Sequence, residues 1–157
     1  MATNLISHLW KTRVPNPHGT SFTLAPVLDL GNGSNITLGS TNDVYKIMTL
    51  PKGTMIGGNW AIYAGDHDSG TALVVTLRLN DGTTQKPIIY QSTVGQAGGV
   101  ARPASLPTVT TGIGFVTDSR SWWLELLIDT QAAGAQAAKL LVQADLCGWV
   151  TPGSVTW

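Results

Sequence analysis

Apolar and polar residues alternate along several short segments of this chain, most clearly in residues 72–79, 122–129 and 140–147. In the first of these, every second position holds a large aliphatic residue: Leu73, Val75, Leu77 and Leu79. Successive side chains of a β-strand point to opposite faces of the sheet. The alternation therefore predicts strands with one face in a hydrophobic core.

Turn residues separate the predicted strands of the central segment, residues 43–82. Strands are expected at 43–50, 55–64 and 72–79. Gly, Pro, Asn and Asp gather between and after them, at residues 51–53, 65–70 and 80–82. Pro presets φ for a turn, and Gly and Asn tolerate a positive φ, so these residues end each strand.

Further strands are predicted on both sides of this centre. Residues 22–30 form a strand at a sheet edge or a bulge, because Pro26 has no N–H to donate. Residues 36–38 pair briefly, and residues 86–92 form a short strand. For residues 131–144 a helix is the alternative, since Ala, Gln, Lys and Leu favour it, but the alternation that continues to Cys147 favours a strand.

Two segments lack strand patterning. Residues 1–21 contain X-Pro pairs, which favour extended backbone, and are expected to form an arm. Residues 93–112 are rich in Gly, Ala, Pro, Ser and Thr. A connection of this length is uncommon in a compact domain unless it binds something or crosses between sheets.

About eight short strands with turns between them predict an all-β protein, built as an antiparallel β-sandwich or barrel. No repeat of 20 to 50 residues is present, which argues against a solenoid or propeller. The expected organisation is an N-terminal arm at 1–21, a β-sandwich domain at 22–148 and a C-terminal tail at 149–157.

Charge is scarce. Only 11% of the 157 residues are charged, against roughly 25% in ordinary soluble domains, and nine basic side chains balance nine acidic ones. No basic footprint for nucleic acid is present. A neutral surface gives a free monomer little protection against association, so the composition suits a subunit of an assembly.

Cys147 is the only cysteine, which rules out an internal disulfide and a four-cysteine metal site. The first thirteen residues lack the pattern of a secretory signal, and no apolar run reaches the roughly 20 residues of a membrane-spanning helix. We expect a protein made in a reducing cytosol, without a membrane partner. Cys147 itself, in an apolar strand, is expected to be an inert buried thiol.

Asp66, Asp68 and Gly70 resemble part of a calcium-binding loop, in which alternating carboxylates converge on one cation. The remaining oxygen ligands and the late bidentate Glu of an EF-hand loop do not follow. A polar turn, with Asp68 hydrogen-bonded to the backbone beside Gly70, is favoured instead. His67 between the two carboxylates is likewise expected to be a solvent-exposed turn residue, not a base or a metal ligand.

Sequence motifs of catalysis are missing: there is no G-x-S-x-G, no H-E-x-x-H and no G-x-x-x-x-G-K-[ST]. Glu125 is the only glutamate, so a pair of glycosidase carboxylates would need an Asp from elsewhere. We therefore expect a non-enzymatic protein without catalytic residues, cofactor or metal.

Five of the six tryptophans divide by position. Trp60 and Trp122 lie on apolar strand faces and are expected in the core. Trp10, Trp149 and Trp157 lie in the arm and tail, where exposed aromatic residues indicate a partner surface or a docked terminus. A sugar-binding aromatic platform is the alternative.

The central segment resembles small structural proteins of tailed bacteriophages, most of all the capsid decoration or cement proteins. The pattern is D-V-Y-K-x-x-x-L-P-K-G-x-x-I-G-G from Asp43, followed by a D-x-D-S-G-T-A loop from Asp66. The resemblance covers roughly residues 43–82. It implies a jelly-roll-like β-sandwich that assembles as homotrimers on the outer face of a phage head, with no catalytic residue to carry over.

On this resemblance, the protein is made in the bacterial host cytoplasm, resides in the virion, and cements neighbouring subunits of the major capsid protein. Its expected contacts are the 93–112 loop and residues of the arm and tail: Leu5, Ile6, Leu9, Trp10, Trp149, Val150 and Trp157. Two alternatives stay open: a tail-associated or host-surface-binding virion protein, and a carbohydrate-binding β-sandwich module.

Overall fold

The computed structural model describes residues 3–5, 21–24, 27–104 and 112–149. These residues form short strands and one 3-10 turn, η1 (Val94–Gln96), with no α-helix among them. The strands are β1 (Thr3–Leu5), β2 (Ser21–Leu24), β3 (Val27–Asp29), β4 (Val44–Leu50), β5 (Thr54–Ile56), β6 (Ala61–Ala64), β7 (Val74–Asn80), β8 (Gln85–Ser92), β9 (Gly99–Ala101), β10 (Trp122–Thr130), β11 (Leu140–Gln143) and β12 (Leu146–Trp149). The all-β prediction is confirmed. The strand predicted over 140–147 begins at Leu140 as expected, but it is divided into β11 and β12, which belong to different sheets.

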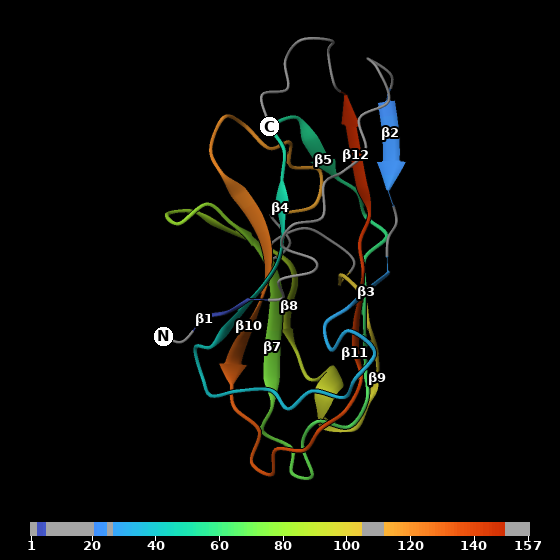
Figure 1. The fold of residues 1–157 in the computed structure, drawn as a ribbon, viewed down its shortest axis with the longest axis vertical. Helices are drawn as coiled ribbons and strands as arrows, with labels where there is room; N and C mark the ends of the chain where they lie inside the picture. Colours follow the sequence, from blue (N-terminus) through green and yellow to red (C-terminus); the bar gives the residue numbers. More distant parts are fainter. Residues whose placement is uncertain (1–2, 6–20, 25–26, 105–111, 150–157) are drawn as a thin grey trace.

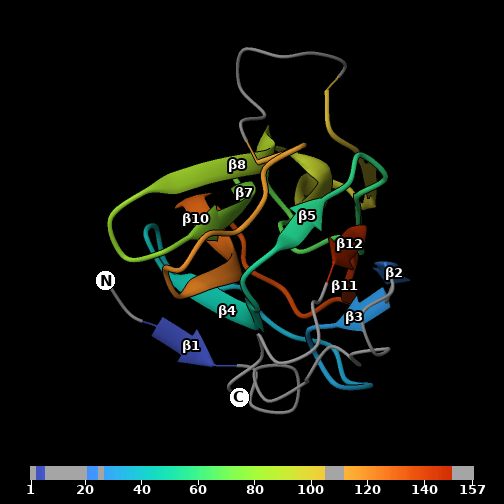
Figure 2. The same cartoon turned by 90° about the horizontal axis from the view of Figure 1, so that it is seen from above.

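The strands form two layers that face each other across the core (Figure 1). One layer is a five-stranded sheet in the order β1-β4-β10-β7-β8. The other combines a four-stranded sheet, β3-β11-β6-β9, with a three-stranded sheet, β2-β12-β5. Seen from above, the five-stranded sheet follows an arc from β8 to β1 (Figure 2).

Three strands of the second layer are each broken in two. The consecutive pairs are β2 and β3, β5 and β6, and β11 and β12. In the three-stranded sheet β12 lies between β2 and β5, and in the four-stranded sheet β11 lies between β3 and β6. If each broken strand is counted once, eight antiparallel strands remain, with β1 added parallel to β4 at one edge. When these eight strands are numbered along the chain, the second layer has the order 1-8-3-6, and the five-stranded sheet without β1 has the order 2-7-4-5. These two orders define jelly-roll topology.

The break between β5 and β6 corrects the prediction of one strand over 55–64. Asp145, between β11 and β12, lies against Gly57, whose N–H donates to the Asp145 carbonyl over 2.9 Å. The Asp145 carboxylate accepts the N–H of Asn59 over 2.9 Å. A side chain at Gly57 would place its Cβ 2.1 Å from that carboxylate, so only glycine fits this crossing.

The predicted strand 22–30 is divided in the same way, into β2 and β3. Both halves lie at sheet edges, as the proline predicted. Residues 25 and 26 lie outside the described residues. The predicted pairing of residues 36–38 is reduced to one isolated bridge, between Ile36 and Ala138.

Large apolar side chains from both layers fill the space between them. Trp60 and Trp122 are buried there, as predicted, and Phe115 packs edge-on against Trp122 with 4.8 Å between ring centroids. The four aliphatic residues predicted on one face of residues 72–79 are all buried in this core. Burial of apolar surface is the main force that holds the two sheets together.

The connection after β8 crosses between the sheets, which was one of its two expected roles. β8 closes the five-stranded sheet, and β9 pairs with β6 in the four-stranded sheet. Gly98 turns the chain back toward β6 with a φ of +73°, and a Cβ there would lie 3.2 Å from the Ala64 carbonyl oxygen. Residues 105–111 of this connection are not among the described residues.

Candidate functional site

Most of the predicted partner-binding residues lie outside the described residues: Ile6, Leu9, Trp10, Val150 and Trp157. The backbone of Leu5 pairs with Lys46 at the edge of the five-stranded sheet. Trp149 ends β12, opposite Ser21 of β2. The contact role of these residues stays a prediction.

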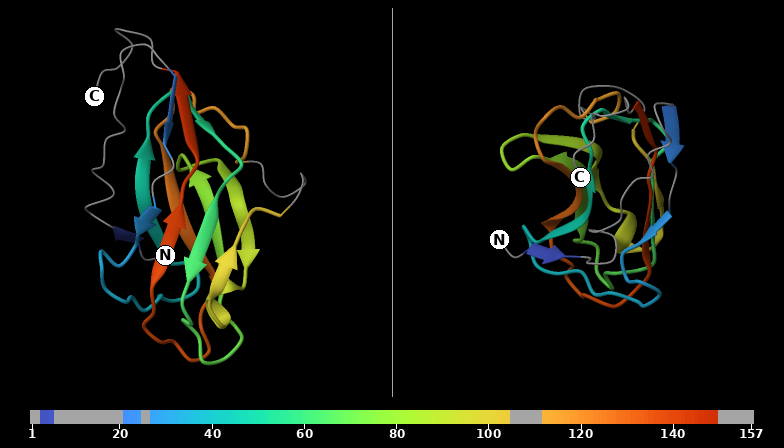
Figure 3. Two further views of the ribbon diagram at one scale, coloured as in Figure 1. Left: turned by 90° about the vertical axis from the view of Figure 1, so that its right-hand side faces the viewer. Right: turned by 45° about the horizontal axis from the view of Figure 1, so that its top comes forward.

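The loop between β6 and β7 is held by Asp68, as the turn interpretation predicted. The carboxylate of Asp68 accepts four backbone N–H groups within 2.8–2.9 Å, from Gly70, Ala72, Leu73 and Gly134. The Gly134 N–H and the other three donors keep the pKa of this carboxyl well below its usual range. Because Gly134 belongs to the β10–β11 loop, Asp68 joins two loops that lie side by side at the lower end of the sandwich (Figures 1 and 3).

His67 is buried, with 1% of its surface exposed, so the prediction of a solvent-exposed residue is wrong. The β10–β11 loop covers it: Nε2 lies 3.1 Å from the Lys139 carbonyl oxygen, and the His67 carbonyl accepts the Gln136 N–H. Within the described part of the chain, Nδ1 has no hydrogen-bond partner. Burial lowers the pKa of the imidazole, because desolvation penalises the charged form.

The outer face of the five-stranded sheet carries a buried ion pair. Arg78 on β7 and Glu125 on β10 are register partners, and Arg78 Nε lies 2.7 Å from Glu125 Oε1. Only 9% and 1% of the two side chains are exposed. Asn80 donates to the same carboxylate oxygen over 2.8 Å, and Arg78 Nη1 donates to Gln85 Oε1 over 2.7 Å. Every charge in this cluster has a partner.

Trp123 completes the cluster. Its indole N–H donates to the second Glu125 oxygen, and the Lys46 ammonium lies 3.9 Å above its ring. The ladder between β10 and β4 shifts register at Leu124 and Glu125, because Ile47 is an extra residue that bulges in β4. The sequence analysis did not single out this cluster. The signal was present, since Glu125 and Arg78 occupy the polar sides of the two best-patterned strands.

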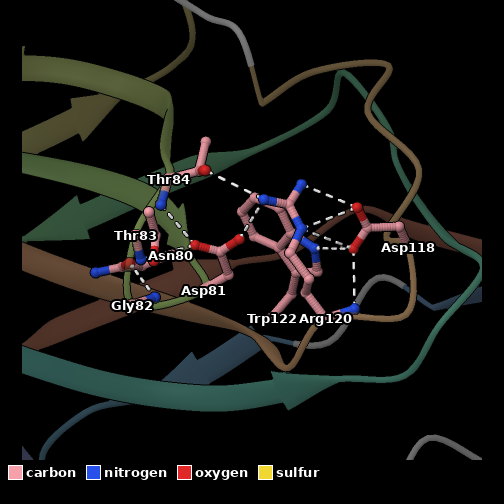
Figure 4. A network of polar contacts seen from close by, with 8 residues as sticks. All are labelled: Asn80, Asp81, Gly82, Thr83, Thr84, Asp118, Arg120 and Trp122. Carbon is pink, nitrogen blue, oxygen red and sulfur yellow. Dashed lines mark hydrogen bonds and ion pairs between the residues drawn. The ribbon is translucent and has the colours of Figure 1, made fainter.

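A second charged network ties the β7–β8 hairpin to the segment before β10 (Figure 4). Arg120 lies 2.6 Å from Asp81 and 2.9 Å from Asp118, and its guanidinium stacks on the Trp122 ring. The hydrogen bonds of Arg120 and Trp122 lower the pKa of the Asp118 carboxyl, and Asp118 in turn raises the pKa of Arg120. This network holds the hairpin in place, with one guanidinium shared between two carboxylates.

The outer face of the four-stranded sheet is different, because it exposes apolar residues. Val100, Tyr63 and Leu141 are successive register partners across β9, β6 and β11. Val100 is 52% exposed, and Tyr63 and Leu141 are half-buried. Val27, on the neighbouring β3, is 58% exposed.

A smaller apolar area lies on the three-stranded sheet. Met55 pairs with Val116 and Cys147, and both Met55 and Val116 are exposed. Cys147 is half-buried, so its thiol is less enclosed than predicted.

No protein-family model matches the chain, and no curated protein matches it in sequence. Two solved structures share its fold. One is a chain from the capsid of Ralstonia phage GP4, with a TM-score of 0.62 over 96% of this chain and 99% of that one, at 18% identity. The other comes from the capsid asymmetric unit of cyanophage Pam1, with a TM-score of 0.54 over 89% and 94% of the two chains, also at 18% identity. At this level of identity the similarity establishes the fold.

The described residues expose apolar surface on the four-stranded and three-stranded sheets. Among them, no group of three or more His, Cys, Asp or Glu side chains is arranged to hold a metal ion. Nor does that part of the chain contain a helix long and apolar enough to cross a membrane. The acidic residues of the two networks are held by ion pairs and backbone donors.

Proposed function

We propose that this protein is a structural component of a bacteriophage virion. The observation that carries the proposal is the length of the match: nearly the whole chain superposes on nearly the whole of a chain from a phage capsid. A second phage capsid chain matches over almost the same length. A similarity that spans both chains end to end supports a shared kind of role better than a shared core alone would.

The proposed role is that of a decoration protein on the outer surface of the head. The protein bridges neighbouring major capsid protein subunits and acts by binding, without catalysis. Contacts repeated over many copies raise the stability of the shell, because ligands that bind only the assembled state stabilise it. The resemblance of residues 43–82 to cement proteins supports this role.

The proposed contacts come from three places. The arm and tail supply Leu5, Ile6, Leu9, Trp10, Trp149, Val150 and Trp157. The exposed apolar face formed by Val27, Tyr63, Val100 and Leu141 supports packing against a neighbouring protein, since apolar residues are enriched at the centre of interfaces. A closed homotrimer is the proposed assembly, because closed cyclic symmetry is the usual arrangement of homo-oligomers and the resemblance to cement proteins implies a trimer.

The test uses capsids assembled without this protein. Purified full-length chain is added, the capsids are sedimented, and the bound copies are located by cryo-electron microscopy. Density at regular positions on the outer surface supports the decoration role, and a variant lacking residues 1–12 should bind more weakly. In a parallel test with tailed particles that lack this protein, density confined to the tail favours the alternative of a tail-associated protein. A chain that remains in the supernatant at every concentration contradicts the proposal.

A further inference from the structure

A shallow pocket opens between β8 and β9, where the two layers of the sandwich meet. Its lining combines one aromatic residue and four polar residues with three apolar ones: Tyr90, Gln91, Ser92, Thr93, Arg102, Ile89, Ala101 and Ala104. Tyr90 is 46% exposed although it lies within a strand. The networks described above do not include Tyr90 or Arg102.

One wall of the pocket is a strained bulge in β8. Val75 pairs with Ser92 and Leu77 pairs with Ile89, so Tyr90 and Gln91 together oppose a single residue of β7. Gln91 adopts a φ of +45°, which is unusual for a residue other than glycine. Strained backbone of this kind persists only where the surrounding structure fixes it, and it is concentrated at functional sites.

Buried polar groups hold this bulge in place. The Gln91 N–H donates to Thr76 Oγ1 over 2.9 Å, and the Thr76 hydroxyl donates to Asp129 over 2.7 Å. Thr76 is the residue opposite the bulge and is itself buried. These two successive hydrogen bonds, from Gln91 to Thr76 and from Thr76 to Asp129, fix the backbone beside Tyr90. The pocket wall is therefore formed before any ligand binds.

The opposite wall places a positive charge at the pocket. Arg102 follows β9, whose position is set by its pairing with β6. Its guanidinium makes one long hydrogen bond, of 3.4 Å, to Asn59. No carboxylate of the described residues lies within ion-pair distance of it, in contrast to Arg78 and Arg120.

We propose that this pocket binds a saccharide unit that carries a carboxylate. A half-exposed tyrosine ring offers a flat surface for the C–H face of a sugar, while its hydroxyl stays available for hydrogen bonding. The hydroxyls of Ser92 and Thr93 and the amide of Gln91 provide donors and acceptors for sugar hydroxyls. The Arg102 guanidinium matches a carboxylate in charge and planar geometry.

A peptide partner fits the pocket less well. Protein interfaces are centred on buried apolar or aromatic anchors, whereas this pocket is shallow and Tyr90, its one aromatic residue, is 46% exposed. Concave sites with a few converging polar groups are typical of small ligands. The inference goes beyond the proposed virion role, because it gives the protein a means of attaching a particle to acidic polysaccharide.

The test is isothermal titration calorimetry on the purified full-length protein. The probes are a hexasaccharide of alternating glucuronate and N-acetylglucosamine, and a neutral hexamer of N-acetylglucosamine. We expect the acidic probe to bind and Tyr90→Ala to weaken its binding at least tenfold, while Tyr90→Phe retains most of the affinity. Arg102→Gln should weaken binding of the acidic probe about tenfold and remove its advantage over the neutral one.

Lys52→Gln is the matched control, because it removes one exposed positive charge outside the pocket. It should bind like wild type, and circular dichroism should show each variant folded. Equal binding of both probes, equal losses from Lys52→Gln and Arg102→Gln, or no binding at millimolar concentration would overturn the proposal. If Tyr90→Ala binds the acidic probe like wild type but no longer binds capsids, the pocket is a protein contact instead. Since the titration needs no capsid, its result is independent of the decoration role.

Discussion

The outer faces of the five-stranded and four-stranded sheets differ in how far their side chains are covered. On the five-stranded sheet, Arg78, Glu125 and Trp123 satisfy one another's polar groups, and the two charged side chains lie largely out of contact with water. On the four-stranded sheet, Val27 and Val100 remain more than half exposed. One face is closed by its own side chains, and the other leaves apolar surface available to a partner.

This contrast indicates which face is structural and which is free to associate. A buried ion pair is costly to desolvate, and it is tolerated only where hydrogen bonds complete it. Exposed apolar residues scattered singly need no explanation, but a row across several strands is typical of an interaction surface. The contrast can be tested by perturbing each face separately.

The largest expected effect comes from removing one partner of the buried pair. Glu125→Ala leaves the Arg78 guanidinium buried without its counter-charge, and we expect a loss of about 3–5 kcal/mol of unfolding free energy. Urea denaturation followed by tryptophan fluorescence measures it. The control is the double variant Arg78→Met/Glu125→Leu, which removes both charges and should lie much closer to wild type. A single variant within 1 kcal/mol of wild type, by the scale of surface substitutions, contradicts the structural role of this face.

The second effect concerns Asp68, which joins the β6–β7 loop to the β10–β11 loop. Asp68→Ala removes the acceptor for four backbone N–H groups from both loops, so the melting temperature should fall by several degrees. Asp66→Ala, in the same loop, is the matched control, since Asp66 is exposed and accepts one N–H over 3.1 Å. Hydrogen exchange at Gly134 should rise in the first variant only. Similar melting of both variants would show that Asp68 does not couple the layers.

The third effect is a pH dependence carried by His67. Burial lowers the pKa of this imidazole in the folded protein, so protonation opposes folding. The contribution of His67 to folding stability is fully present above the pKa of the unfolded chain, about 6.5. It is lost as the pH falls from there toward the lower pKa of the folded protein. Asp68 and Asp118 also have lowered pKa values, but their contributions are lost at more acidic pH, below about 4. The melting temperature of wild type should therefore fall more steeply than that of His67→Gln between pH 7 and 5. Parallel curves would contradict this assignment.

The sequence predicted what local alternation and turn chemistry control. The runs at 72–79 and 122–129 became β7 and β10, and Asp68 bonds the backbone of its own loop. The expected number of about eight strands is reached only when each broken strand is counted once and β1 is left out, and neither β1 nor β9 was predicted.

The predictions that went wrong depend on contacts between distant segments. The strand over 55–64 is broken because Asp145, almost ninety positions later, occupies the space at Gly57. His67 is buried because the β10–β11 loop closes over it, and a polar turn flanked by aspartates carries no local sign of that. The pocket at Tyr90 likewise needs a bulge defined by pairing with β7. Periodicity reports which side of a strand is apolar, but not what covers the other side.

The smallest effect on the fold, and the most informative about function, is expected on the apolar face. Val27→Ser and Val100→Ser replace exposed side chains, so each should change the unfolding free energy by no more than about 0.5 kcal/mol. If this face packs against a neighbouring protein, the double variant should still melt like wild type but bind capsids at least tenfold more weakly. Thr83→Ala, an exposed change in the β7–β8 hairpin, is the control and should leave capsid binding unchanged. Sedimentation with capsids and light scattering of the free protein measure both forms of association. Unchanged binding by a well-folded double variant would move the contact surface away from this sheet, toward the arm and tail.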